Sequence, residues 1–259
     1  MKTIILCGGK GTRIRDVAAN APKPMIRIGG VPILQHIMSI YGDQGHKDFV
    51  LALGYRSWEI KEYFLNFEVA THDLEIRMGD GQRSVSKANG STPNWRITLA
   101  ETGLESQTGY RILKVRQYLQ GERFMLTYGD GVGDVDLAAL LEFHIASGRL
   151  ATVTAVHPPA RFGVLAIDDD GIVSKFAEKP QTSKGRINGG FFVCEPGVLD
   201  YIDDDPMCSF EQGPLMRLAA DGQLAAFRHD GFWMPMDTYR EYVLLNDLWD
   251  SGNAPWLQT

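Results

Sequence analysis

The chain has 259 residues, of which 44% are hydrophobic and 22% are charged, as in an ordinary globular protein with one large or two small domains. Its formal charge of −6 argues against a nucleic-acid coat and against a polybasic membrane anchor. The three cysteines form no CxxC pair, the N-terminus is too polar for a signal peptide, and no run of about 18 apolar residues exists. We therefore expect a cytoplasmic protein with neither a nucleic-acid nor a membrane partner.

A buried strand is expected over residues 2–7, and the glycine-rich stretch "CGGKGTR" follows it directly. This stretch lacks the third glycine of the dinucleotide fingerprint G-x-G-x-x-G when the frame starts at Gly9, and it has Lys10 in place of the second glycine when the frame starts at Gly8. It also lacks the Gly-Lys-Ser/Thr end of a Walker A loop. Backbone N–H groups in such a turn can approach an anion closely, so the pattern predicts a phosphate-binding loop of another kind.

Strands and helices alternate along the rest of the chain. Helices are expected over residues 32–45, 57–67 with Ser57 as N-cap, 136–148 ending at Gly148, 213–222 and 238–252; strands are expected over 47–55, 123–131 and, in a run of four, 150–196. This alternation indicates an α/β fold with a Rossmann-like, doubly wound sheet that is mixed but mostly parallel. The strand-rich stretch from about 150 to 195 predicts an added small antiparallel element.

We expect one domain over residues 1–259 because no linker, repeat or low-complexity tract is present. Residues 68–95 form a polar insertion that is too long for a plain connection in a compact domain. The insertion is therefore expected to serve as a lid or as an oligomer contact.

Three charged residues are candidates for a phosphate and metal site. Lys23 lies in "APKPM", where the flanking prolines favour an extended backbone; it is either a point charge for a phosphate or a surface lysine. Asp130 follows an apolar strand in "TYGDG", which fits either a Mg²⁺ ligand or a hairpin turn, although the segment "DVDLAALLEF" after it has a helical pattern. Asp237 precedes a helix and is an N-cap, a Mg²⁺ ligand or both.

Nucleophilic catalysis finds no support in the sequence. Cys7 has no evident histidine partner, which favours a small residue at a strand end over a nucleophile, and no G-x-S-x-G elbow is present. The six histidines show no metal-binding spacing.

Seven stretches match one family in order and spacing: "ILCGGKGTRI", "APKPMIRIGGVPIL", "YGDGV", "RFGVL", "FAEKP", "INGGFFV" and "GFWMPMDT". Together they resemble the sugar-1-phosphate nucleotidylyltransferases, and the resemblance covers nearly the whole chain. It implies transfer of a nucleotidyl group to a sugar 1-phosphate with release of pyrophosphate. It also implies a nucleotide-binding part at about 1–150 and a sugar-phosphate-binding part at about 151–259.

The resemblance further implies a role for particular residues. The nucleotide would be bound by Leu6, Cys7, Gly8, Gly9, Gly11, Thr12, Arg13, Lys23, Ser106, Arg111 and Gly129. The sugar phosphate would be bound by Tyr128, Glu178, Lys179 and Asn188. Asp130 and Asp237 would share one Mg²⁺, and the catalytic cations would be Arg13, Lys23 and Lys179, with Arg13 placed on the departing pyrophosphate.

Within the family, "GYRSWEIKEYF", "NWRITLAETG" followed by "TGYR", "YGDGVGDVDL" and "GFWMPMDTYRE" are most similar to members that convert CTP and glucose 1-phosphate to CDP-glucose. The sequence departs from the pattern of these members at Cys7, where the family usually has alanine, and at Tyr110, where the most similar pattern has glycine. UTP, dTTP or GTP as the nucleotide, or the phosphate of another sugar, therefore stays an alternative. A catalytically silent nucleotide-binding subunit is a further alternative, disfavoured because the charged candidates are all present. The resemblance also implies a homo-oligomer, a trimer or hexamer, and a role in making deoxysugars of a surface polysaccharide.

Overall fold

The computed structural model of the chain describes residues 1–9, 11, 14, 21–79, 81–86, 92–158, 164–167, 173–177 and 185–257. Within these ranges, residues 86, 164–167 and 173–177 are described by their backbone alone. None of the helices in these ranges is both long enough and apolar enough to span a membrane.

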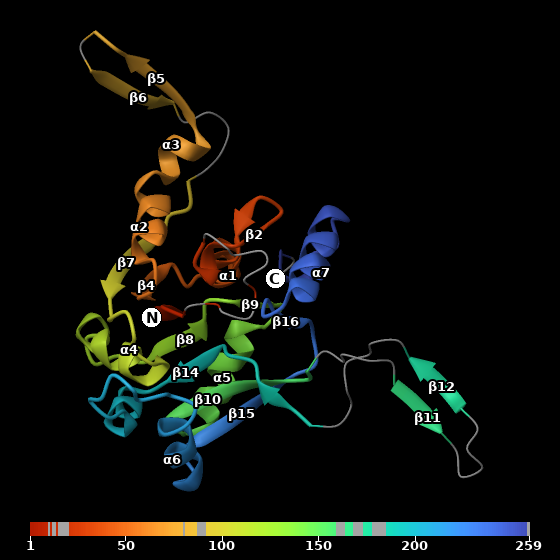
Figure 1. Ribbon diagram of the computed structural model, residues 1–259. Coiled ribbons are helices and arrows are strands. Elements are labelled where there is room, and N and C mark those ends of the chain that lie inside the picture. Colours follow the sequence, from red (N-terminus) through yellow and green to blue (C-terminus); the bar gives the residue numbers. More distant parts are fainter. Residues whose placement is uncertain are drawn as a thin grey trace.

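A sheet of eight strands forms the centre of the molecule (Figure 1). Its strands are β1 (Lys2–Cys7), β4 (Asp48–Leu53), β7 (Arg96–Glu101), β8 (Phe124–Tyr128), β10 (Ala151–Val156), β13 (Ile187–Asn188), β14 (Phe192–Cys194) and β15 (Leu224–His229). The spatial order is β13-β10-β14-β8-β1-β4-β7, with β15 beside β10. Strands β8, β1, β4 and β7 run parallel, while β14 and β13 are antiparallel to their neighbours. The predicted mixed, mostly parallel sheet is confirmed.

Helices cover both faces of this sheet. The helices of the described residues are α1 (Ile33–Asp43), α2 (Ser57–Leu65), α3 (Phe67–Thr71), α4 (Thr108–Lys114), α5 (Leu137–Ser147), α6 (Pro214–Ala220) and α7 (Tyr239–Asp250), with 3-10 turns η2 (Lys23–Met25), η3 (Arg116–Tyr118), η4 (Pro196–Tyr201) and η5 (Pro255–Leu257). Of these, α3 has no buried residue and lies at the base of a projecting hairpin (Figure 1). Successive strand side chains point to opposite faces, so a fully apolar strand contributes to two cores. Ile5 of β1 packs with α1 in one cluster, and Ile4 packs with α4 in the other.

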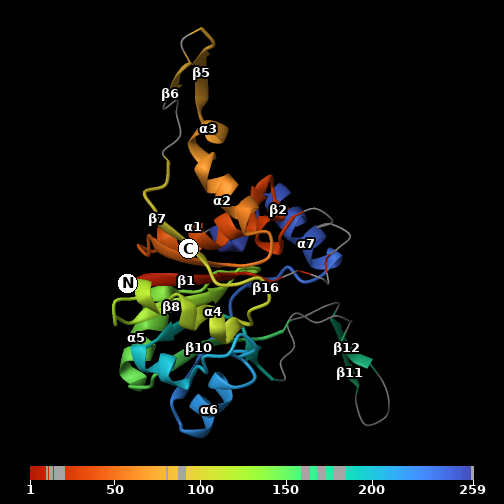
Figure 2. The same ribbon diagram turned by 60° about the vertical axis from the view of Figure 1, so that its left-hand side comes forward.

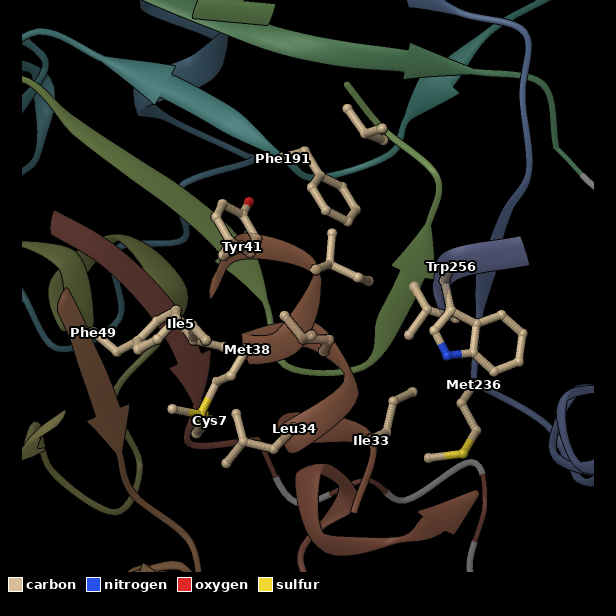
Figure 3. Close-up of a cluster of buried hydrophobic side chains, with 14 of the residues drawn as sticks. Ile5, Cys7, Ile33, Leu34, Met38, Tyr41, Phe49, Phe191, Met236 and Trp256 are labelled. Carbon is tan, nitrogen blue, oxygen red and sulfur yellow. The ribbon is translucent and has the colours of Figure 1, made fainter. Parts of the chain in front are cut away.

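Figure 3 shows the first of these clusters, in which the side chain of Cys7 lies among Ile5, Leu34 and Met38. Cys7 is completely buried, and burial raises the pKa of its thiol far above the ordinary value. A buried thiol of this kind is inert, which agrees with the prediction of a small strand-end residue.

Two hairpins project from the body in both views (Figures 1 and 2). One is β5 (Asp73–Arg77) with β6 (Gln82–Ser86), which extends α2 and α3 and lies in the predicted 68–95 insertion. The other is β11 (Val164–Ile167) with β12 (Val173–Ala177). The predicted antiparallel element at about 150–195 is present, but only β11 and β12 form a separate small sheet. The other strands of this stretch, β10, β13 and β14, belong to the central sheet.

Some local expectations are wrong at the level of single residues. The N-cap of α2 is Arg56 in a left-handed conformation, and Ser57 is already helical, so it caps nothing. The strands β7 and β15 and the helix α4 have no counterpart among the predicted elements, because their mixture of polar and apolar residues gives no clear strand or helix pattern. By contrast, α5 stops at Gly148 as predicted, with a φ of 60° that glycine accepts without strain.

Candidate active site

The candidate site lies where the strand order changes direction. After β1 the chain builds β4 and β7 on one side, and then returns to place β8 on the other side of β1. Ligands of open α/β sheets bind outside the carboxyl ends of the strands at such a switch point. A pocket of about 330 Å³ opens there, lined by Gly8 and Gly9 after β1 and by Tyr128, Gly129 and Asp130 at the end of β8.

The glycine loop rests on the guanidinium of Arg111, a residue of α4 that is 4% exposed. The two terminal nitrogens of Arg111 donate to the carbonyl oxygens of Leu53, Gly103, Gly8 and Leu104 and to Thr102 Oγ1. A Cβ atom on Gly8 would lie 2.1 Å from Arg111 Cζ, so only glycine leaves room for the guanidinium. Arg111 lines the predicted nucleotide pocket and also holds the loop and the ends of β4 and β7 together.

We expect Gly8→Ala to lower the free energy of unfolding by about 2 to 4 kcal/mol, because the guanidinium must leave its acceptors and strand them in the interior. Arginine is usually a flexible side chain, but here the hydrogen bonds and burial keep it in place. Gly9→Ala is the matched control, since a Cβ atom there meets no atom within 4 Å. Urea unfolding of both variants measures the difference, and equal losses would contradict this role of Arg111.

Lys23 places a positive charge between two carboxylates in the pocket. Its Nζ lies 2.6 Å from Asp130 Oδ2 and also forms an ion pair with Asp237 Oδ1. The Lys23 side chain is 11% exposed, against 32% and 36% for the two aspartates. Burial lowers the pKa of Lys23, but Asp130 and then Asp237 outweigh burial and raise this pKa above its ordinary value. The lysine therefore stays charged throughout the physiological pH range.

The backbone at Lys23 differs from the prediction. Lys23 begins the 3-10 turn η2, closed by a hydrogen bond of 3.1 Å from Ile26 N to Lys23 O, and only Pro22 before it is extended. From this tight turn the Lys23 side chain lines the pocket. The finding corrects the local conformation that the flanking prolines suggested.

Asp237 comes to the site through a short antiparallel pairing of β9 (Gly131–Gly133) with β16 (Trp233–Pro235). In this register Pro235 is paired with Gly131, and Met236 N donates to Asp130 O at 2.8 Å. The next residue, Asp237, thus lies beside Asp130. Because β9 pairs with β16 and not with β8, the hairpin-turn alternative for Asp130 is wrong.

The N-cap alternative for Asp237 is wrong as well. The cap of α7 is Thr238, whose side chain accepts from Glu241 N while Glu241 accepts from the backbone N–H groups of Asp237 and Thr238. The cap of the helix is thus the residue after Asp237, and Asp237 itself lines the pocket. Asp130 and Asp237 converge on one cationic atom, and a pair of hard carboxylate oxygens is a donor set that suits Mg²⁺.

The remaining predicted residues fall into three groups. Leu6, Gly11 and Ser106 line the same pocket, and Ser106 Oγ donates to Thr102 O at 2.6 Å; the Cys7 side chain points into the core instead. Asn188 does not line the pocket itself, but its Nδ2 donates a 2.9 Å hydrogen bond to the hydroxyl of Tyr128, which does. Thr12, Arg13, Glu178 and Lys179 lie outside the described residues.

Sequence reasoning missed several residues at the site. Pro24, Gln107 and Thr108 line the pocket, and Glu211 contacts Tyr128 and Thr108 from the segment before α6. Gln107 and Thr108 lie at the start of α4, which gave no recognisable pattern. Glu211 lies in "SFEQGP", which has the composition of a loop and carries no local signal of a function.

The site combines a lysine, two carboxylates that converge on it and a glycine loop, and it lies at the switch point of a doubly wound sheet. These features define a site for phosphorylated nucleotides. The family model "Nucleotidyl transferase" matches residues 2–246, and the chain belongs to this family. The chain is 48% identical over 257 residues to glucose-1-phosphate cytidylyltransferase of Salmonella typhi, covering 99% of this chain and 98% of that protein. It is 44% identical to a probable glucose-1-phosphate cytidylyltransferase of Bacillus subtilis, covering 99% of both.

Solved structures support the same fold. A putative glucose-1-phosphate thymidylyltransferase from Bacillus anthracis, crystallised with sucrose, superposes with a TM-score of 0.65 at 17% identity, covering 96% of this chain and 94% of that one. HddC from Yersinia pseudotuberculosis in complex with GMP-PN gives a TM-score of 0.66 at 23% identity, covering 96% and 99%. At these identities the likeness concerns the fold alone.

Proposed function

We propose that the chain is a glucose-1-phosphate cytidylyltransferase, which transfers the cytidylyl group of CTP to α-D-glucose 1-phosphate and releases pyrophosphate. The observation that carries the proposal is the cluster of Lys23, Asp130 and Asp237 in the pocket beside the glycine loop. The choice of CTP and glucose 1-phosphate is supported by 48% identity to the Salmonella typhi cytidylyltransferase over nearly the full length of both chains.

The reaction requires the protein to bring two polyanions together. A phosphate oxygen of the sugar phosphate attacks the α-phosphorus in line with the departing pyrophosphate, and this nucleophile is already an anion, so no general base is needed. One pair of like charges at 4 Å repels by about 1 kcal/mol in water and about 4 kcal/mol at an effective dielectric constant of 20. Lys23 offsets this repulsion with a charge that is held in place before the substrates arrive.

We further propose that Asp130 and Asp237 hold one Mg²⁺, which would neutralise phosphate charge in the bound substrates. Among the residues that the structure describes, no group of three or more His, Cys, Asp or Glu side chains could hold a metal. The proposed ion would therefore take most of its ligands from substrate oxygens and water, as Mg²⁺ usually does. Arg13, Glu178 and Lys179 keep their proposed roles toward pyrophosphate and sugar phosphate.

A matrix of CTP, UTP, dTTP and GTP against several sugar 1-phosphates, assayed with MgCl₂ by pyrophosphate release, tests the proposed function. We expect CTP with glucose 1-phosphate to give the highest kcat/KM and CDP-glucose as the product. A higher value for another pair would assign the chain to that pair. Nucleotide binding without turnover of any pair would instead support the silent-subunit alternative.

We also propose that the protein works as a homo-oligomer, a trimer or hexamer, in the cytoplasm. The projecting hairpin exposes Ile76 and Met78, at 48% and 89%, although both are apolar. A groove of about 470 Å³ lined by residues such as Phe64 and Trp95 lies at its base. The cytoplasmic location is supported separately by three buried, unpaired cysteines, which fit a reducing compartment.

The oligomer can be tested by its mass. Sedimentation equilibrium is expected to give three or six times the mass of one chain, and a monomer would contradict the assembly.

A further inference from the structure

Glu211 is the centre of a hydrogen-bond network behind the pocket. It lies between η4 and α6, and its carboxylate accepts three hydroxyl hydrogen bonds. Tyr128 Oη donates to Oε1 at 2.8 Å, and both Thr108 Oγ1 and Ser209 Oγ donate to Oε2, at 2.6 and 2.8 Å. Tyr128 and Thr108 line the pocket, so Glu211 connects two of its walls without lining it.

The carboxylate fixes the direction of the hydrogen bond from Tyr128. An ionised carboxylate only accepts, so the phenolic proton must point to Glu211. The oxygen of Tyr128 therefore faces the rest of its surroundings as an acceptor.

The direction of this hydrogen bond continues to Asn188. Asn188 Nδ2 donates to the Tyr128 oxygen at 2.9 Å, and Asn188 Oδ1 accepts from Gly190 N at 2.9 Å. Because a backbone N–H can only donate, and because Tyr128 has given its proton to Glu211, one orientation of the amide satisfies both partners. A chain of Glu211, Tyr128 and Asn188 thus has a single hydrogen-bond polarity.

We propose that Glu211 is a positioning residue that sets the hydrogen-bond polarity of the wall that receives the sugar phosphate. Through Tyr128 it makes this wall accept a hydrogen bond from a sugar hydroxyl and withholds the phenolic proton from the ligand. Through Thr108 it ties this wall to α4, whose Arg111 supports the glycine loop on the nucleotide side. The inference rests on the proposed function for the identity of the ligand, a sugar 1-phosphate.

Glu211→Gln keeps the shape of the side chain but replaces one acceptor by an NH₂ donor. Both Oε atoms are acceptors in the present network, but Oε2 serves two hydroxyls and Oε1 serves only Tyr128. The amide therefore keeps most of these bonds when its NH₂ group faces Tyr128, whose phenol then loses its acceptor and must rearrange with Asn188. We expect the KM for glucose 1-phosphate to rise about tenfold while the KM for CTP changes less than about twofold. Ser209→Ala is the matched control: it removes one hydroxyl that donates to Glu211 but leaves both carboxylate oxygens in place, and it is expected to change either KM by less than about twofold.

The Tyr128→Phe variant tests the network from its other end and does not depend on the folding of Glu211→Gln. It is expected to raise the KM for glucose 1-phosphate about as much as Glu211→Gln does. In the Tyr128→Phe background, Glu211→Gln should add less than about twofold, because its effect passes through the phenol. An unchanged KM for the sugar phosphate in Tyr128→Phe, or a full additional effect in the double variant, would overturn the proposal. Equal rises in both KM values would overturn it too, because they indicate a general structural defect.

The same assay separates this inference from the proposed function. If wild-type protein turns over another nucleotide and sugar phosphate, the comparison is made with that pair. If wild-type protein turns over no pair, the proposed function fails, and calorimetric titration with glucose 1-phosphate still compares wild type with Glu211→Gln. A dissociation constant about tenfold higher for the variant is expected, and an equal one overturns the role of Glu211.

Discussion

Asp130→Asn is expected to lower kcat/KM for pyrophosphate release by about 10²- to 10³-fold, because it removes a carboxylate that positions Lys23 and would hold Mg²⁺ beside the reacting phosphates. Asparagine keeps the size of the side chain, and Lys23 keeps its ion pair with Asp237, so the variant should fold normally. If Asp130 holds Mg²⁺, raising the MgCl₂ concentration should restore part of the lost activity. Activity measured over a range of MgCl₂ concentrations therefore tests both the catalytic role and the metal.

The control for this experiment is Asp203→Asn, which removes a carboxylate that pairs with Arg217 at the exposed surface at 2.9 Å. Surface pairs contribute little to stability, so this variant is expected to match wild type. A kcat/KM for Asp130→Asn within about threefold of wild type would show that the role assigned to Asp130 is wrong.

Lys23→Met is expected to lower kcat/KM by a similar factor of about 10² to 10³, and it should also change the response to Mg²⁺ in the absence of substrates. Without Lys23, Asp130 and Asp237 face one another with no cation between them, and like charges at this separation repel. The melting temperature in EDTA should therefore fall below that of wild type. Adding MgCl₂ should raise it more than in wild type, where the lysine already occupies the space between the carboxylates.

Thermal unfolding with and without MgCl₂ measures this second effect independently of turnover. Lys61→Met is the matched control, since Lys61 pairs with Glu101 outside the pocket. An equal Mg²⁺-dependent shift for wild type and Lys23→Met would contradict a metal site at these carboxylates. Unchanged kcat/KM would contradict the role of Lys23 in binding the phosphates.

The strands beside the site were predictable because each carries a strong local signal. The strands β1, β4 and β8 are recognised by their apolar runs, which arise because side chains on both faces of a parallel sheet must be buried. The edge strand β7 has an alternating pattern over six residues, and α4 has only seven residues. Sequences with such mixed patterns fit several structures about equally well, so their packing against β4 and β1 decides their conformation.

Helix and turn ends depend on contacts that local patterns do not contain. Thr238 caps α7 in a capping box with Glu241, so the cap lies one residue after Asp237. Ser57 is a good N-cap residue by its type, but α2 begins at Ser57 itself, and Arg56 takes the cap position. Boundaries within one or two residues are therefore where sequence reasoning fails most easily.

The sequence by itself determined the class of fold, the glycine-rich loop after β1 and the individual charges, because strand periodicity, glycine content and charge are local properties. Only the tertiary structure decided which charges meet. Asp130 and Asp237 are joined by the pairing of β9 with β16, and Lys23 reaches both from a separate turn. Glu211 meets Tyr128 across 83 residues of sequence. Such contacts arise because burying the two faces of one sheet brings distant loops to the same edge, and no local pattern records that geometry.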